Sequence, residues 1–461
     1  MEKENTNNTL IINSETEKSL PETSDTTETA AQGTIEQNLT GSSNVGDDAK
    51  TAKKKKTVGV MIVSVIAVAS VIIMVLIVGG NKSSRKDVPE LFSQGLLVAS
   101  TDGKWGYIDK SGSYVINPQF NAAGSFSKNG LAYVNSNGRY GYIDKKGTYV
   151  IEPQFNGASS FSDNGLACVV SDGKFGYIDK TGSFVINPQF EYAGDFSDNG
   201  LALVENYEKY GYIDKTGKYV INPQFEEAND FSGNGLARVK SGEKYGYIDR
   251  TGSYIINAQF EYASDFAENG LACAASGGKY GYIDKTGKYA INPQFDSAGS
   301  FADNGLAYAS NSGKYGYIDK TGTFVINLQF DNAGNFNDGV AVVKLGDKFG
   351  LIDAKGSYIV NPMYVDMSWV PYCGCLYFAD ENEKIGYIDI SGKEIIPAQF
   401  DYLYYLDGLE YGFYSFGLAG NFYEDGYAIV RMGDKFGVID KSGSYIVTPE
   451  FDGLGTWSSK D

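Results

Sequence analysis

One short pattern recurs along most of this chain of 461 residues. The tetrad Gly-Tyr-Ile-Asp, or a close variant, occurs ten times, and successive copies are separated by 35 residues six times and then by 34, 36 and 51. A unit of this length is too short to enclose a hydrophobic core of its own, so neighbouring units must bury one another's apolar faces. The copies begin at Gly106, Gly141, Gly176, Gly211, Gly246, Gly281, Gly316, Gly350, Gly386 and Gly437.

A single unit, residues 130–164, contains signals for three strands and a loop. We expect strands at Leu131–Asn135, Arg139–Asp144 and Thr148–Phe155, followed by a loop at Asn156–Asn164. The abundance of Gly, Tyr and Phe (57, 35 and 26 residues) against 11 Pro also favours strands and tight turns over helices. The sequence therefore predicts an all-β array of about ten three-stranded antiparallel units.

The turn between the second and third strands has the form Asp-x-x-Gly in all ten units, as at Asp144 and Gly147. Asp at the first and Gly at the fourth position indicate a type I turn followed by a left-handed residue. Positions that hardly vary between copies are interpreted as scaffold. One column accepts very different side chains, so we expect it not to be a close-packed core position; it holds Tyr133, Cys168, Leu203, Arg238, Cys273 and Tyr308.

The units can be arranged in two ways, as an open array or as a closed ring. Propellers typically use four-stranded blades of about 40–50 residues in rings of about 4–8. Ten three-stranded units of 35 residues favour instead an open, superhelically curved array, with propeller-like closure as the alternative.

The N-terminal part of the chain has a different composition. Residues 1–52 form an acidic tail whose composition predicts disorder, and residues 53–80 hold a basic flank and an uncharged run, Thr57–Val78. Those 22 residues would span about 33 Å as a helix, enough for one membrane crossing. A cleaved signal peptide would be shorter and would lack the preceding acidic tail.

Basic residues set the expected orientation of that helix. Lys50 and Lys53 to Lys56 precede it, whereas Lys82, Arg85 and Lys86 follow. The positive-inside rule then leaves the N-terminal tail in the cytoplasm and the array outside the cell. We expect a single-pass protein of the cell membrane, with a linker at 81–94 before the repeats.

The repeats divide into a regular part, residues 95–361, and a degenerate part, residues 362–461. The last spacing implies about 16 inserted residues within 402–425, a segment dense in aromatics. Aromatic side chains stack on ligands and fill pockets in partners. The candidate ligand-binding residues are Tyr405, Tyr411, Tyr414, Trp369 and Tyr372. The alternative is a capping unit that covers the end of the stack.

The chemistry of the chain argues against an enzyme. It has no histidine, which excludes imidazole-based triads and histidine-rich zinc motifs, and its acidic residues recur at turns in every copy. The only cysteine cluster, Cys373 and Cys375, lacks the spacing of a zinc site. A net charge of −18 argues against nucleic acid as a partner. We expect no catalytic residues, cofactor or metal.

The unit resembles the WG repeat, also called the KWG repeat, of bacterial proteins. Lys104–Asp109 match the Lys-Trp-Gly-Tyr-Ile-Asp signature, and Ile116–Phe120 match its Ile-x-Pro-x-Phe strand. Nine copies replace the tryptophan by Tyr, Phe or Ile, which changes the size of a side chain expected to be buried, as at Trp105, Tyr210 and Tyr280. The resemblance implies a β-repeat that is often exported or anchored, and it transfers no catalytic residues.

Two functions remain open at this point. The first is a membrane-anchored extracellular binding module, presenting an extended aromatic-rich surface to cell-wall polysaccharide or to a protein partner. The second is a structural spacer without a specific ligand.

Overall fold

The computed structural model describes residues 89–197, 199–402 and 420–455, all within the second of the chain's two units, residues 60–461. These residues form eight four-stranded antiparallel sheets and one seven-stranded sheet that joins the ninth and tenth repeat units. One short 3₁₀ helix, η1 (Ser93–Gly95), precedes the first strand. The predicted all-β repeat array of about ten units is confirmed.

Each unit contains the predicted three-stranded meander. The first strands are β1 (Leu97–Thr101), β5 (Ala132–Ser136), β9 (Ala167–Ser171), β13 (Ala202–Asn206), β17 (Ala237–Ser241), β21 (Ala272–Ser276), β25 (Ala307–Asn311), β29 (Val340–Leu345), β33 (Cys375–Ala379) and β36 (Tyr427–Met432). The second strands are β2 (Lys104–Ile108), β6 (Arg139–Ile143), β10 (Lys174–Ile178), β14 (Lys209–Ile213), β18 (Lys244–Ile248), β22 (Lys279–Ile283), β26 (Lys314–Ile318), β30 (Lys348–Asp353), β34 (Lys384–Asp389) and β37 (Lys435–Asp440). The third strands are β3 (Tyr114–Phe120), β7 (Tyr149–Phe155), β11 (Phe184–Phe190), β15 (Tyr219–Phe225), β19 (Tyr254–Phe260), β23 (Tyr289–Phe295), β27 (Phe324–Phe330), β31 (Tyr358–Tyr364), β35 (Glu394–Asp401) and β38 (Tyr445–Phe451).

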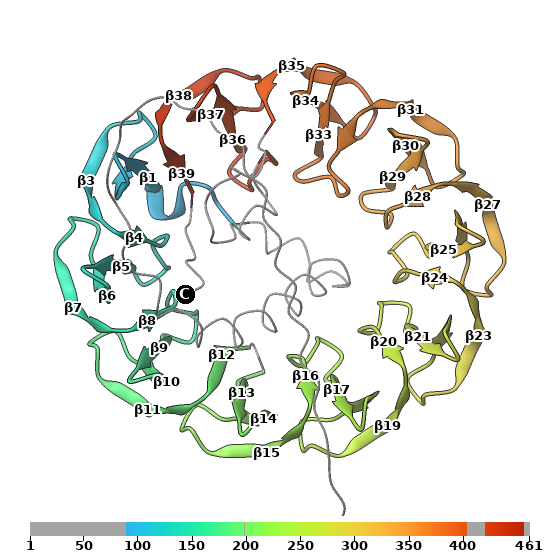
Figure 1. The fold of residues 1–461 in the computed structure, drawn as a ribbon, viewed down its shortest axis with the longest axis horizontal. Coiled ribbons are helices and arrows are strands. Elements are labelled where there is room, and N and C mark those ends of the chain that lie inside the picture. The colour runs from blue at the N-terminus through green and yellow to red at the C-terminus, as the bar shows by residue number, and fades with distance from the viewer. Residues whose placement is uncertain (1–88, 198, 403–419, 456–461) are drawn as a thin grey trace, which may run out of the picture. The chain divides into compact units, whose positions relative to one another are not determined.

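A fourth strand joins these meanders where the sequence predicted only a loop. The predicted loop Asn156–Asn164 contains β8, which pairs with β9 of the following meander. Figure 1 shows such short strands toward the centre and the third strands along the rim. They are β4 (Ala122–Ala123), β8 (Gly157–Ala158), β12 (Tyr192–Phe196), β16 (Glu227–Ala228), β20 (Tyr262–Ala263), β24 (Ser297–Ala298), β28 (Asn332–Ala333), β32 (Asp366–Met367) and β39 (Gly453–Leu454).

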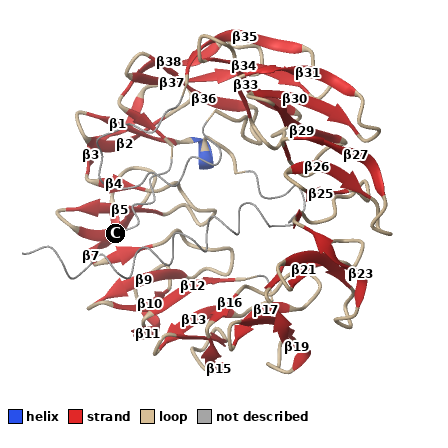
Figure 2. Cartoon of the chain, turned by 45° about the vertical axis from the view of Figure 1, so that its right-hand side comes forward, coloured by secondary structure: helices blue, strands red, loops and turns tan. Residues whose placement is uncertain are grey.

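The two ends of the repeat array meet. The last strand, β39, pairs with β1, with Ala99 opposite Leu454 and Ser100 opposite Gly453. Although no single sheet among the described residues closes on itself, the sheets form a ring (Figures 1 and 2). The expectation of an open superhelical array is therefore wrong, and the propeller-like alternative is correct. A fourth strand can be only two residues long, so 35 residues suffice for a four-stranded blade.

The closing junction repeats the contacts of the other junctions. The ring of Phe120 packs edge-on against Tyr149 of the next unit, with centroids 6.4 Å apart, and Phe451 packs in the same way on Tyr114 at 5.7 Å. Apolar side chains of both terminal units share one core, which includes Leu97 and Val447. The first unit therefore follows the tenth as it would follow any neighbour.

The tetrad glycine is required by close backbone approach. The register between the second and third strands shifts beside this glycine, so the third strand bulges over it. A Cβ atom on Gly211 would lie 2.5 Å from the Ile221 carbonyl oxygen and 2.6 Å from the Pro223 nitrogen. Real Cβ atoms do not approach backbone this closely, which explains the recurrence of glycine.

The residue after the tetrad glycine forms the centre of each unit's core, and it is a tyrosine in eight of the ten units and Leu351 or Val438 in the other two. Tyr282, for example, is fully buried and donates a hydrogen bond from its hydroxyl to the Gly299 carbonyl at 2.7 Å. Its ring contacts Phe301 in the loop, with centroids 4.6 Å apart. The aromatic residue before the glycine is less uniformly buried than expected, because Trp105 is buried whereas Tyr210 and Tyr280 are half-buried.

The variable column is more buried than its composition predicted. Cys168 and Cys273 are 6% and 1% exposed, and each thiol lies 3.5 Å from a carbonyl oxygen of the next unit's inner strand. Arg238 reaches the equivalent carbonyl of Ala263 through its guanidinium. Different donors therefore satisfy one backbone acceptor, which explains how a packed position tolerates such different side chains.

The predicted membrane helix at 57–78 lies outside the described residues. Within residues 89–197, 199–402 and 420–455, no helix is long and apolar enough to cross a membrane.

Candidate functional site

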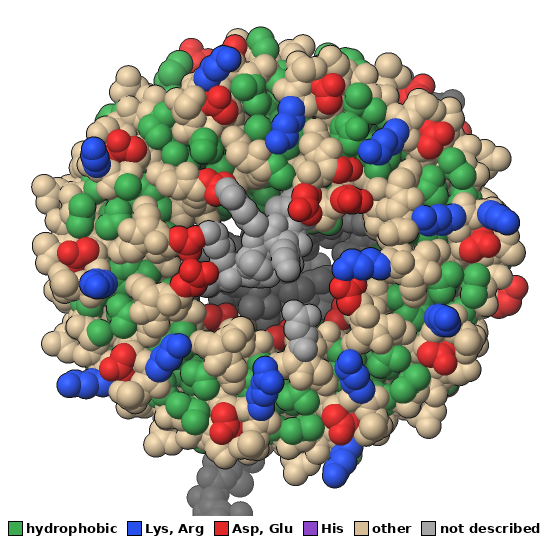
Figure 3. Space-filling view, turned by 180° about the vertical axis from the view of Figure 1, so that it is seen from behind, with side chains coloured by type: hydrophobic (Ala, Val, Ile, Leu, Met, Phe, Trp, Pro, Cys, Tyr) green, Lys and Arg blue, Asp and Glu red, His purple; other side chains and the backbone are tan. Residues whose placement is uncertain are grey.

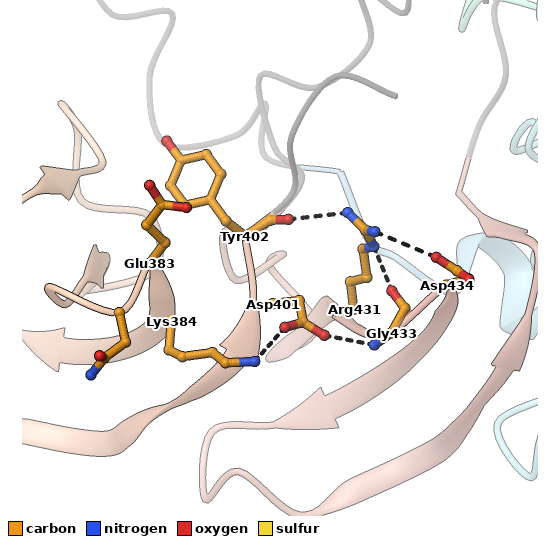
Figure 4. A pocket seen from close by; sticks show the side chains of 8 residues that line it. Glu383, Lys384, Asp401, Tyr402, Arg431, Gly433 and Asp434 are labelled. Carbon is orange, nitrogen blue, oxygen red and sulfur yellow. Dashed lines mark hydrogen bonds and ion pairs between the residues drawn. The ribbon is translucent and has the colours of Figure 1, made fainter. Parts of the chain in front are cut away.

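An open groove lies between the hairpin tips of the ninth and tenth units (Figure 4). Its volume is about 360 Å³. It is lined by Asn382, Glu383, Lys384, Asp401, Tyr402, Arg431, Gly433 and Asp434, which come from the turn before β34, the end of β35, β36 and the turn after β36.

Part of this groove follows the repeat pattern. In seven units, a lysine at the start of the second strand pairs with an acid that follows the third strand. The pairs are Lys174–Glu191, Lys209–Glu226, Lys244–Glu261, Lys279–Asp296, Lys314–Asp331, Lys384–Asp401 and Lys435–Asp452. The acid also accepts a backbone N–H from the next hairpin tip, as Glu191 does from Tyr207 at 2.7 Å. These carboxylates therefore join neighbouring units.

Asp401 performs this joining role in the groove. Its carboxylate pairs with Lys384 and accepts the Gly433 N–H at 2.6 Å. The hydrogen bond from Lys384 and then that from Gly433 lower the pKa of Asp401 below its ordinary value. Asp401 and Lys384 are thus committed to holding the two units together.

The next residue, Tyr402, departs from the pattern. In the fifth unit the equivalent residue is Glu227, which bonds to Lys240 and Tyr245 of its own sheet. Tyr402 instead reaches back to the preceding unit, where its hydroxyl hydrogen-bonds to Asp366. The Tyr402 side chain also lines the groove.

Arg431 forms the opposite wall (Figure 4). Its Nε donates to the Gly433 carbonyl at 2.7 Å, and its Nη1 donates to the Tyr402 carbonyl at 3.3 Å. Its Nη2 lies 3.7 Å from the Asp434 carboxylate. Three interactions therefore hold the guanidinium in one orientation.

Glu383 is a groove residue whose carboxylate is not engaged by the rest of the described protein. Its backbone is left-handed, with φ of 58°, and its carboxylate has no hydrogen-bond or ion-pair partner among the described residues. Beside it, the Asn382 side-chain amide donates to Asp380 at 3.3 Å. The groove thus combines carboxylate acceptors, amide and guanidinium donors and one aromatic ring, a set suited to noncovalent recognition.

The five predicted ligand-binding residues do not line the groove among the described residues. Tyr405, Tyr411 and Tyr414 lie outside the described residues. Trp369 is 37% exposed and packs edge-on against Phe349, with centroids 5.4 Å apart.

Tyr372 pairs with Cys375 through two backbone hydrogen bonds, and burial raises the pKa of its phenol. Neither Trp369 nor Tyr372 lines the groove. The sequence did not identify Glu383 or Arg431 as groove residues. The available signal was a bulky acidic residue at a turn position where several units have glycine.

Ring closure also bears on the capping alternative. A terminal cap covers the exposed end of an open stack, but in this ring the first and tenth units cover each other. The insertion lies within residues 402–425, between the last strand of the ninth unit, β35, and the first strand of the tenth, β36. The rationale for a cap therefore does not apply there.

Acidic residues also lie in or just after the inner strands of three consecutive units, at Asp195, Asp230 and Asp265. Figure 3 shows acidic side chains around the inner rim of the ring. Desolvation by the surrounding protein raises the pKa of Asp230 to about 6, although the side chain keeps some contact with solvent, and the negative charges of Asp195 and Asp265 add to this shift. Among the described residues, no group of three or more His, Cys, Asp or Glu side chains is placed to hold a metal ion.

Comparisons with known proteins agree with the repeat architecture. The family described as WG containing repeat matches residues 105–140, 140–175, 175–210, 210–245, 245–280, 280–315, 315–349, 385–409, 415–436 and 436–460. A search of curated proteins gives no match.

Several solved structures are similar at low identity. A eukaryotic initiation factor is 13% identical, with a TM-score of 0.43, and the match covers 68% of this chain and 97% of that one. The computationally designed Ika8 protein is 11% identical (TM-score 0.32; 63% and 94% covered), and BamB from Moraxella catarrhalis is 12% identical (TM-score 0.31; 61% and 92% covered).

Proposed function

This chain belongs to the WG-containing repeat family, and we propose that it is a membrane-anchored binding module for cell-wall polysaccharide or a protein partner. A β-rich repeat domain of this kind is consistent with a binding or scaffold role. In the proposal, Thr57–Val78 anchors the chain, the N-terminal tail is cytoplasmic and the ring is extracellular.

The groove between the ninth and tenth units carries this proposal. Elsewhere the repeated acids and tyrosines are used to join units and fill cores. At this junction the Tyr402 hydroxyl bonds to Asp366 of the preceding unit, and an aromatic-rich insertion of about 16 residues follows Tyr402. A spacer without a ligand has no use for an aromatic-rich insertion beside a groove, so the observation favours binding over the spacer alternative.

The test is retention of the full-length, detergent-solubilised protein on purified cell-wall material. We expect retention by the intact chain. Changing Tyr405, Tyr411 and Tyr414 together to Ser should weaken retention without altering the melting of units one to seven, because aromatic side chains that recognise a partner contribute to affinity before stability. Matched substitution of Tyr149, Tyr219 and Tyr254, which lie at unit junctions, should instead lower the melting temperature.

Two outcomes decide between the alternatives. Failure of the intact protein to bind wall material or to capture any specific protein would favour the spacer. Binding that declines only in proportion to unfolding of the triple variant would place the insertion's role in stability.

A further inference from the structure

We infer that the groove between the ninth and tenth units binds a hydroxyl-rich saccharide that carries no carboxylate or phosphate. This inference rests on the proposed binding function and names the ligand class of the groove. It follows from the charges, the aromatic wall and the donor and acceptor pattern of the lining residues.

The charges of the groove disfavour an anionic ligand. Both cationic side chains are already engaged, Lys384 by Asp401 and Arg431 by Asp434 and two backbone carbonyls. The Glu383 carboxylate has no such partner among the described residues. An incoming carboxylate or phosphate would face three acids, Glu383, Asp401 and Asp434, against two cations that are each already paired with a carboxylate. Such an excess of like charge disfavours an anionic ligand.

The aromatic wall is held in a fixed orientation. The Tyr402 hydroxyl is bonded to Asp366, and its carbonyl accepts from Arg431, so both ends of the residue are held. Figure 4 shows Tyr402 beside Glu383, with Arg431 and Asp434 across the groove. The electron-rich face of an aromatic ring attracts the polarised C–H groups that a pyranose presents on one face.

The polar lining disfavours an apolar ligand and suits hydroxyl groups. A hydroxyl both donates and accepts, so it can donate to Glu383 or Asp434 and accept from the Asn382 amide. A volume of about 360 Å³ lies at the small end of ligand sites, which extend to about 1,000 Å³. The groove therefore accommodates a short stretch of a glycan chain.

The chain supplies a matched control for Glu383. Glu243 of the fifth unit also directly precedes the second-strand lysine, in a shorter hairpin loop, and it also has a left-handed backbone, with φ of 61° against 58° for Glu383. Because glycine adopts this conformation without strain, Glu383→Gly and Glu243→Gly should both fold at least as stably as the parent protein. Only the first removes a carboxylate from the groove.

The experiment measures binding of three soluble probes to the full-length protein by calorimetry: cellotriose, the chitosan trimer and trigalacturonic acid. We expect cellotriose and the chitosan trimer to bind and trigalacturonic acid not to bind. Glu383→Gly should weaken binding by about tenfold, the size expected for loss of a charged hydrogen-bond acceptor. Glu243→Gly should leave affinity unchanged, and melting temperatures should confirm that both variants are folded.

The inference is rejected if none of the neutral or amine-bearing probes binds, if trigalacturonic acid binds best, or if both glycine variants lose affinity equally. Retention on wall material in the absence of oligosaccharide binding would reject the groove's ligand class while leaving the proposed function standing. Specific capture of a protein with no sugar binding would also reject it, in favour of a protein partner. Loss of both kinds of binding would reject both proposals.

Discussion

Replacement of Gly211 by Ala should strongly destabilise the fourth unit. The added Cβ would lie 2.5 Å from the Ile221 carbonyl oxygen and 2.6 Å from the Pro223 nitrogen, both backbone atoms of the bulge in β15. Neither atom can move without displacing the strand. Overpacking against a flexible side chain typically costs about 1–3 kcal/mol, so a clash with backbone should reach or exceed the upper part of that range.

A control lies at Gly233, in the loop between β16 and β17 of the adjoining fifth unit. A Cβ atom there would have no neighbour within 4 Å, and the residue does not require positive φ. Gly233→Ala should therefore be neutral or stabilising by about 0.4–1 kcal/mol, because it restricts the unfolded chain. Urea denaturation gives the change in unfolding free energy, and amide hydrogen exchange of β14 and β15 locates it. Equal stability of the two variants would refute the explanation of the recurring glycine.

Three further predictions follow from the described contacts and from the N-terminal sequence. Tyr282→Phe should cost about 0.5–1.5 kcal/mol in urea denaturation, because it removes the hydroxyl that donates to Gly299. The raised pKa of Asp230, about 6, means that the folded protein holds this proton more tightly than the unfolded chain. The parent protein should therefore gain stability relative to Asp230→Asn as the pH falls from 7 to 5, and parallel pH profiles of the two melting temperatures would contradict this. Protease added to intact cells should digest residues 90–461 and spare residues 1–50, and replacing Lys53 to Lys56 by Gln should weaken that orientation without preventing insertion. Protection of the repeats in accessible cells would reverse the assignment.

The repeat period and the turn chemistry were sufficient to predict the units. The Asp-x-x-Gly signal predicted turns such as that of Asp144, whose backbone N–H and carbonyl bond to Thr148 and Gly147. The inner strands escaped prediction because a strand of two residues shows no alternation. Without a fourth strand, a unit of 35 residues is smaller than the usual propeller blade, so the sequence favoured the open array.

The groove was harder to predict from the sequence than the strands and turns. It depends on whether Tyr402 bonds within its own sheet or reaches Asp366, 36 residues earlier, and residue type alone does not decide this. The prediction that the variable column is not closely packed was wrong for a related reason. Its side chains at Cys168 and Arg238 bond to equivalent backbone carbonyls that only the neighbouring unit supplies. Patterns within one unit predict its strands, whereas junctions depend on how units meet.

Ring closure is tested most directly by a disulfide introduced with the paired substitutions Ser100→Cys and Gly453→Cys. Ser100 and Gly453 are paired residues of β1 and β39, and a Cβ atom on Gly453 would lie 2.9 Å from the Ser100 Oγ. The two introduced thiols should oxidise within one molecule, because opposed strand residues meet the geometric requirement for a disulfide. Peptide mapping of the monomer should recover a cross-link between positions 100 and 453 at every protein concentration. An open array would give no such monomeric cross-link, only reduced thiols or concentration-dependent dimers.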